Sequence, residues 1–228
     1  MSIADNLLKY KSELDLVGVK LVAVSKNHPA EAALEAYNAG QRIFGENLVQ
    51  EMVEKQAQLP KDIDWHLIGH LQTNKVKYIA PFIKLIESVD SIKLLKEINK
   101  QAAKNNRIID CLLQIYIADE ETKFGFGFDE VIELLRSEEF IALKNVRIVG
   151  LMGIATNTAL DGQTIAEFQE LKVLFEGIKL SFFRKEDSFK EISMGMSSDY
   201  KLAIEHGSTM VRIGSNIFGK RVIKHWKA

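Results

Sequence analysis

The sequence has few of the residues that cross-link or interrupt a chain. Its 228 residues include one cysteine, Cys111, so no disulfide can form within the chain, and the composition gives no sign of an oxidising compartment. Prolines stand only at positions 29, 60 and 81, and no stretch is rich in serine and glycine or in charge of one sign. With no recognisable linker, we expect a single domain over residues 1–228.

Long apolar runs and an excess of one charge are also missing. No stretch approaches the roughly 18 consecutive apolar residues that a membrane span needs, and the start, MSIADNLLKYKSELD, lacks the apolar core and cleavage site of a signal peptide. The 30 lysines and arginines nearly balance the 31 aspartates and glutamates, so charge does not indicate a nucleic acid partner. The composition predicts a cytoplasmic protein with neither a membrane nor a nucleic acid as partner.

A strand-like run followed by a segment with helical spacing recurs along the chain. The eight runs cover residues 18–25, 41–45, 63–68, 83–89, 108–117, 146–152, 190–194 and 209–213. Apolar strands that alternate with helices predict a parallel α/β fold, and eight units fit a closed (β/α)8 TIM barrel, here with an extra N-terminal helix over 2–14. An open doubly wound sheet is the alternative, although the first turn, SKNHP, lacks the glycines usual there.

A lysine directly follows the first predicted strand. Functional residues of such barrels lie at strand ends, and in LVAVSKNHP (21–29) the alternation of side chains puts Lys26 on the same face as Val22 and Val24. If that face points into the barrel, partial desolvation lowers the pKa of the Lys26 amine and makes it available to form a Schiff base. On this stretch alone, a surface lysine that opens a loop is the simpler interpretation. Pro29 is expected to begin the next helix.

Serine and glycine gather at the last two strand ends, in SMGMSSD (193–199) and RIGSNIFG (212–219). Hydroxyls and backbone N–H groups next to glycine form phosphate-binding loops, and barrels commonly hold phosphate at these two loops. Gly195, Gly207 and Gly214 could equally be ordinary turn glycines. A reactive lysine opposite a phosphate cradle suggests a ligand with an aldehyde and a phosphate, a description that pyridoxal 5′-phosphate (PLP) fits.

Arg212 adds a chemical detail to this hypothesis. It alternates with Val211 and Ile213, so if these two face the helices, Arg212 and Met210 face the barrel interior. An arginine beside a pyridine nitrogen disfavours protonation of the ring, which makes the ring a poorer electron sink for carbanion chemistry. An arginine at the barrel bottom or on a phosphate is the alternative.

Several motifs resemble the pyridoxal phosphate homeostasis protein family. They are LVAVSK (21–26), FGENLVQE (44–51), WHLIGHLQTNK (65–75), GLMGIAT (150–156) and ISMGMSSDYKLAIEHGSTMVRIGSNIFGKR (192–221). The resemblance implies a barrel like the N-terminal domain of alanine racemase, with PLP as a Schiff base on Lys26, phosphate on the serine and glycine loops and Arg212 near the ring nitrogen. The cofactor-binding residues that it implies are Lys26, Asn47, Ser193, Met194, Ser197, Arg212, Gly214 and Ser215.

The chain departs from the family pattern at three positions. Tyr116 stands where asparagine is usual, Val149 where arginine is frequent, and His70 where some relatives have proline. Tyr116 could act as an acid or base if it faces the ring, although packing at the rim is the simpler interpretation. His66 and His70 have the spacing of a zinc pair on a helix, but WHLI and Gly69 indicate a strand, so we interpret both as structural and expect no metal.

The function implied by the resemblance is intracellular PLP homeostasis without robust catalytic turnover. In alanine racemase a second domain closes the site and supplies a tyrosine base, whereas this sequence ends at Ala228, soon after the eighth strand. We expect a monomer that hands PLP to PLP-dependent apo-enzymes. Two alternatives remain: a small fold-type III PLP enzyme, a racemase or decarboxylase with Lys26 and Tyr116 as acid and base, and a cofactor-free Schiff-base aldolase that acts on a sugar phosphate.

Overall fold

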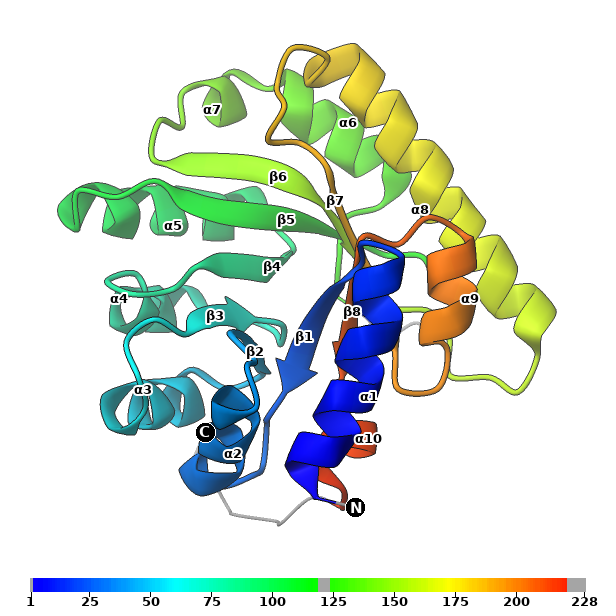
Figure 1. The fold of residues 1–228 in the computed structure, drawn as a ribbon. Helices are drawn as coiled ribbons and strands as arrows, with labels where there is room; N and C mark the ends of the chain where they lie inside the picture. Colours follow the sequence, from blue (N-terminus) through cyan, green and yellow to red (C-terminus); the bar gives the residue numbers. More distant parts are fainter. Residues whose placement is uncertain (1, 119–123, 221–228) are drawn as a thin grey trace.

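Eight parallel strands close into a barrel in the computed structural model, which describes residues 2–118 and 124–220 (Figure 1). The strands follow one another around the barrel in sequence order, and β8 pairs with β1. They are β1 (Lys20–Val24), β2 (Ile43–Glu46), β3 (Asp64–Leu67), β4 (Leu85–Val89), β5 (Ile109–Ile115), β6 (Val146–Gly153), β7 (Glu191–Met196) and β8 (Met210–Ile213). The predicted (β/α)8 barrel is confirmed, and every strand lies where the sequence predicted it.

Helices surround the barrel and join one strand to the next (Figure 1). They are α1 (Ile3–Leu16), α2 (Ala30–Asn38), α3 (Val49–Gln58), α4 (Val76–Ile79), α5 (Ile92–Lys104), α6 (Phe128–Arg136), α7 (Glu138–Ile141), α8 (Asp161–Phe182), α9 (Tyr200–Glu205) and α10 (Ser215–Phe218), with a 3₁₀ turn η1 (Thr73–Lys75). The expected N-terminal helix is α1, which begins with a capping box: the Ser2 hydroxyl accepts from the Asp5 N–H, and the Asp5 carboxylate accepts from the Ser2 N–H. Pro29 is the residue before α2, as predicted.

The alternation of side chains along the strands divides the apolar core in two. On β1, Leu21 and Ala23 belong to the large outer cluster between the strands and the helices. Val22 belongs to a smaller cluster that fills the barrel interior. The interior cluster consists of Val22, Leu85, Leu112, Val149, Met152 and Met210, all buried. The face of β1 that carries Val22 therefore points into the barrel. This is the arrangement under which the sequence predicted a partly desolvated Lys26.

The two histidines of WHLIGH do not share a helix. His66 lies on β3, and His70 lies in the loop that follows. Nδ1 of His66 is 2.7 Å from Glu87 Oε1, and Nδ1 of His70 is 2.9 Å from Asp90 Oδ2. Each ring is thus oriented by a different carboxylate.

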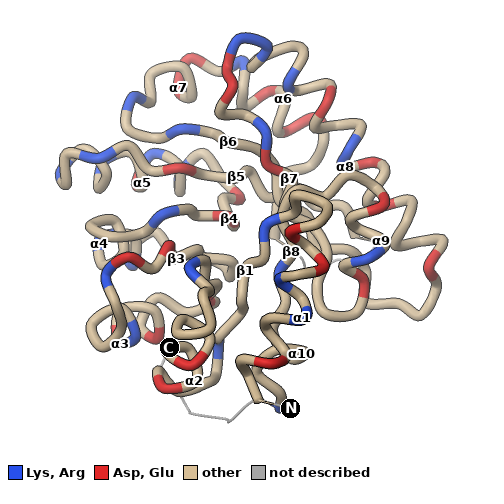
Figure 2. Tube along the Cα trace, viewed as in Figure 1, with Lys and Arg blue, Asp and Glu red and all other residues tan. Residues whose placement is uncertain are grey.

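The helices differ little in their charge character. Figure 2 shows lysine and arginine interspersed with aspartate and glutamate along them. Within residues 2–118 and 124–220, no helix is both long enough and apolar enough to span a bilayer.

Candidate functional site

A pocket of about 320 Å³ opens at the carboxyl ends of the strands, and we call it the mouth pocket. Residues after β1, β2, β7 and β8 contribute to its walls, so distant parts of the sequence meet there. Six of the predicted cofactor residues line it: Lys26, Asn47, Ser197, Arg212, Gly214 and Ser215. The lysine, the serine and glycine loops and the arginine therefore share one cavity.

Lys26 reaches this pocket because of the strand periodicity. Val22 fills the barrel interior, and Val24, two residues on, lines the mouth pocket. Lys26, two residues beyond the end of β1, also lines this pocket and so lies on the same side as Val22 and Val24. A lysine at this point lies at the boundary between the apolar barrel core and the open mouth.

Buried carboxylates hold the backbone on both sides of Lys26. Before it, the Ser25 hydroxyl donates to Glu46 Oε1 at 2.6 Å. After it, Asn27 adopts a φ of 62° and its N–H donates to Glu51 Oε1 at 2.7 Å. Asparagine tolerates this left-handed conformation better than most residues. The loop that carries the lysine is therefore fixed by two groups that lie behind it.

The two carboxylates share one ammonium group, and we call Glu46, Glu51 and Lys55 the Lys55 cluster. Lys55 is 2% exposed, and its Nζ donates to Glu46 Oε1 at 2.6 Å, to Glu51 Oε1 at 2.8 Å and to the Ser25 carbonyl at 2.7 Å. Glu46 Oε2 and Glu51 Oε2 are buried with no hydrogen-bond partner among the described residues. Burial raises the pKa of Glu46 to about 7; the Lys55 charge opposes this rise and the Glu51 charge adds to it. The cluster thus retains a proton at pH values where an exposed glutamate has lost it.

The opposite wall of the mouth pocket is made of hydroxyl and backbone N–H groups. The Gly214 N–H donates to Ser197 Oγ at 3.3 Å, and the Asn216 side-chain amide donates to the Ser197 carbonyl at 2.9 Å, which ties the loops after β7 and β8 together. A Cβ at position 214 would lie 3.1 Å from the Val24 carbonyl oxygen, closer than an ordinary contact. Glycine therefore allows this loop to approach β1, and Ser215 completes a wall suited to a phosphate.

Arg212 faces the interior, as the alternation of β8 predicted, and is 4% exposed. Its Nη1 donates to Ser193 Oγ at 2.6 Å, its Nη2 donates to the Gly153 carbonyl at 2.9 Å, and Glu87 Oε2 lies 3.9 Å from Nη1. Burial lowers the pKa of the guanidinium, and the negative charge of Glu87 opposes this. The guanidinium is held in one orientation and presents its remaining surface to the mouth pocket.

Two predicted cofactor residues do not line the pocket. The Ser193 hydroxyl is fully buried below it and is used by Arg212 and Glu87. Met194 alternates to the other face of β7 and packs in the outer core. Neither side chain lines the mouth pocket, and their role in cofactor binding stays a prediction. Tyr116, after β5, is not among the lining residues either.

Half of the residues that line the mouth pocket were not predicted from the sequence. The residues not predicted as ligands are Val24, His28, Ile68, Ile154, Met196 and Ser198. All lie at or just beyond the carboxyl end of a strand, so position along the strand was the available signal. His28, in the SKNHP turn, is 6% exposed, and its ring centre lies 5.4 Å from that of Phe218.

Comparison with known proteins agrees with this geometry. The family model for the alanine racemase N-terminal domain matches residues 1–222. The barrel with a lysine after its first strand is thus of the alanine racemase N-terminal type. The pyridoxal phosphate homeostasis protein of Aquifex aeolicus is 40% identical over 89% of this chain and 87% of its own. The human protein of the same name is also 40% identical, over 92% of this chain and 79% of its own.

The structure of PipY from Synechococcus elongatus with PLP bound is similar as well. It is 38% identical, the match covers 96% of this chain and all of that one, and the TM-score is 0.86. This chain belongs to the pyridoxal phosphate homeostasis protein family.

Proposed function

We propose that this protein binds PLP in the mouth pocket, holds it as a Schiff base on Lys26, and acts in PLP homeostasis as a carrier without robust catalytic turnover. The observation that carries the proposal is the meeting of Lys26, the serine and glycine wall and Arg212 in one cavity. PLP bound to PipY, a relative with the same fold, supports the choice of ligand.

The residues present fit such a ligand. A cavity of about 320 Å³ lies at the lower end of the range for small-ligand pockets. PLP supplies an aldehyde that an amine can attack and a ring that can act as an electron sink. Lys26 supplies the amine, and Ser197, Gly214 and Ser215 supply hydroxyl and N–H donors for the phosphate.

Arg212 favours retention of PLP over turnover. A guanidinium near the ring nitrogen opposes protonation of that nitrogen, because two positive charges would then be close together. The hydrogen bonds to Ser193 and Gly153 prevent the guanidinium from turning away. Within the described part of the chain, the pocket lining includes no tyrosine that could serve as a racemase base.

A titration with PLP tests the proposal. Wild-type protein should take up one equivalent of PLP with a new visible absorption band, and Lys26→Ala should lose that band. Lys93→Ala, at an exposed position on α5, is the matched control and should behave as the wild type. An unchanged band in Lys26→Ala would refute the role of Lys26, and no uptake by the wild type would favour the sugar-phosphate aldolase alternative.

Catalysis is tested on the PLP-loaded protein with amino acids as substrates. We expect negligible racemisation and decarboxylation. Sustained turnover that is lost in Tyr116→Phe, with the absorption band retained, would instead support the enzyme alternative.

The finer features of the proposal are a cytoplasmic monomer, one PLP-binding unit over residues 1–228, and PLP-dependent apo-enzymes as recipients. The buried free thiol of Cys111 is consistent with a reducing compartment. Sedimentation at several concentrations tests the monomer. Transfer is tested by mixing PLP-loaded protein with an apo-enzyme and following the activity of that enzyme. The activity should return faster than in a mixture of the apo-enzyme, Lys26→Ala and the same concentration of free PLP.

A further inference from the structure

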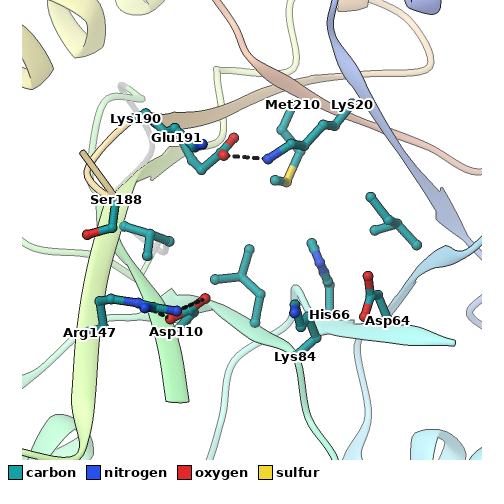
Figure 3. Close-up of a pocket in the computed structure, with 13 residues that line it drawn as sticks. Lys20, Asp64, His66, Lys84, Asp110, Arg147, Ser188, Lys190, Glu191 and Met210 are labelled. Atoms are coloured by element: carbon teal, nitrogen blue, oxygen red, sulfur yellow. Dashed lines mark hydrogen bonds and ion pairs between the residues drawn. The ribbon is translucent and has the colours of Figure 1, made fainter. Parts of the chain in front are cut away.

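A second pocket lies at the opposite end of the barrel, where the strands begin, and we call it the base pocket (Figure 3). Its volume is about 360 Å³. Most of the charged side chains drawn in Figure 3 are paired: Lys20 with Glu191, and Arg147 with Asp110 through two hydrogen bonds of 2.6 and 3.0 Å. Asp64, Lys84, Lys190 and His66 also line this pocket, outside these two ion pairs.

His66 lines the base pocket but is only 4% exposed. Its Nδ1 is 2.7 Å from Glu87 Oε1, while its Nε2 has no hydrogen bond to any described residue. Figure 3 shows the ring beside Asp64 and Lys84. One edge of His66 thus faces the base pocket, and the other edge is bound to a carboxylate in the barrel core.

A continuous chain of hydrogen bonds runs from His66 to the mouth pocket, and we call it the axial chain. Glu87 Oε1 is bound to His66, and Glu87 Oε2 accepts from Ser193 Oγ at 2.6 Å. Ser193 Oγ accepts from Arg212 Nη1 at 2.6 Å. Its members come from β3, β4, β7 and β8, and Glu87 and Ser193 are both fully buried. The chain connects the two pockets through the interior of the barrel.

The direction of each hydrogen bond in the axial chain follows from Arg212 at one end and from the ionised Glu87. A guanidinium can only donate, so the Ser193 hydroxyl must accept from Arg212 and give its own hydrogen to Glu87. An ionised Glu87 can only accept, so the hydrogen between it and His66 lies on Nδ1. Burial acts to raise the pKa of Glu87, but the hydrogen bonds from His66 and Ser193 and the neighbouring positive charges outweigh it and leave the pKa below its ordinary value. The carboxylate therefore supplies a negative charge that balances Arg212.

We propose that His66, Glu87 and Ser193 are positioning residues for Arg212, so that the electrostatics of the mouth pocket are set in part from the base pocket. This inference rests on the proposed function, because Arg212 acts on PLP in that account. Glu87 and Ser193 orient the guanidinium and balance its charge. His66 holds Glu87 and connects it to the opposite end of the barrel.

The first experiment needs no PLP. The Arg212 Nε signal of ¹⁵N-arginine-labelled protein is identified by its loss in Arg212→Lys. Ser193→Ala, Glu87→Gln and His66→Leu should each shift this signal. His66 does so without contacting Arg212, because Glu87 and Ser193 lie between them in the axial chain. Lys93→Ala, at an exposed position on α5 outside both pockets, is the control and should leave the signal unchanged. His66→Asn should return the signal toward its wild-type position, because its amide can donate to Glu87.

The second experiment measures bound PLP. Loss of the Glu87 charge makes the mouth pocket more positive, so the pH midpoint of the PLP absorption band should fall in Glu87→Gln. One charge removed at roughly 10 to 20 Å, with an effective dielectric constant near 20, gives a fall of about 0.6 to 1.2 pH units. Ser193→Ala removes the hydrogen bond that orients Arg212. It should weaken PLP binding about three- to tenfold, as expected for the loss of one hydrogen bond.

The outcomes separate this inference from the proposed function. If the NMR shifts appear but the wild type takes up no PLP, the proposed function fails while the axial chain stands. If Arg212→Lys alters PLP binding but Glu87→Gln, Ser193→Ala and His66→Leu all match the Lys93→Ala control in both experiments, the inference is wrong. Should Glu87→Gln fail to fold, Ser193→Ala and His66→Leu still decide the matter.

Discussion

Replacing Glu46 by glutamine should remove a pH dependence from the free energy of unfolding. Burial raises the pKa of Glu46 from an ordinary value of 4.5 to about 7 in the folded protein. Between these two values the folded state keeps a proton that the unfolded chain has released. The folded state is therefore favoured at low pH, and this contribution to stability is lost as the pH rises from about 4.5 to about 7.

The magnitude follows from the size of the shift. A change of one pKa unit corresponds to about 1.4 kcal/mol, so a rise from 4.5 to about 7 gives about 3 kcal/mol in total. Part of this is already lost at pH 5, which leaves roughly 2 to 3 kcal/mol between pH 5 and pH 8. Glu46→Gln has no titrating group at this position, while Glu51 and Lys55 keep their ion pair.

Urea denaturation followed by circular dichroism at several pH values measures the effect. The free energy of unfolding of the wild type minus that of Glu46→Gln should fall by roughly 2 to 3 kcal/mol from pH 5 to pH 8 and stay constant above that. Taking the difference cancels the titration of groups that do not interact with Glu46. A difference that does not vary with pH, or that increases with pH, would refute the assignment of a retained proton to the Lys55 cluster.

Three further predictions concern single side chains. Gly214→Ala should weaken PLP binding severalfold, because the new Cβ would lie 3.1 Å from the Val24 carbonyl; unchanged affinity in a titration would contradict this. Lys55→Met should lower the free energy of unfolding by about 3 to 5 kcal/mol, since it leaves buried carboxylates without a cation; a loss below about 1 kcal/mol in urea denaturation would count against it. Cys111 is 0% exposed and burial raises the pKa of its thiol, so a thiol reagent should label it only after unfolding, and rapid labelling of the native protein would be inconsistent with the barrel core.

The fold could be predicted from the sequence because its signals are local. Strands buried on both faces are short apolar runs, and each run is followed by a segment with helical spacing, so the eight units could be counted along the chain. The alternation of side chains also gave the correct face for Lys26 and Arg212, since β1 and β8 pair in a regular register from Lys20 to Ala23 and from Met210 to Ile213. The count of strands and helices and the faces of Lys26 and Arg212 follow from the two-residue repeat of a strand and the 3.6-residue repeat of a helix.

Depth within the barrel was not predictable in the same way. Ser193 stands in a serine and glycine motif, yet it lies below the mouth pocket, and Met194 faces the helices. The pairing of β7 with β8 shifts register between Ser193 and Met196, which alternation along one strand does not reveal. A motif gives the residue types near a site, whereas pairing with the neighbouring strands decides which of them reach it.

The buried charges were missed because their partners are distant or their spacing is commonplace. Glu51 and Lys55 are four residues apart on α3, a spacing that usually indicates an ion pair on an exposed helix face. His66 and Glu87 lie on different strands and meet only once the barrel closes. Groups of this kind are recognised when the structure gives their burial and contacts.

The central claim is that the amine of Lys26 forms the bond that holds PLP, and reduction followed by peptide mapping tests it most directly. PLP-loaded protein is treated with borohydride, digested and analysed by mass spectrometry. The account predicts one phosphopyridoxyl adduct, located on Lys26. An adduct located on any other lysine, with Lys26 unmodified, would contradict it.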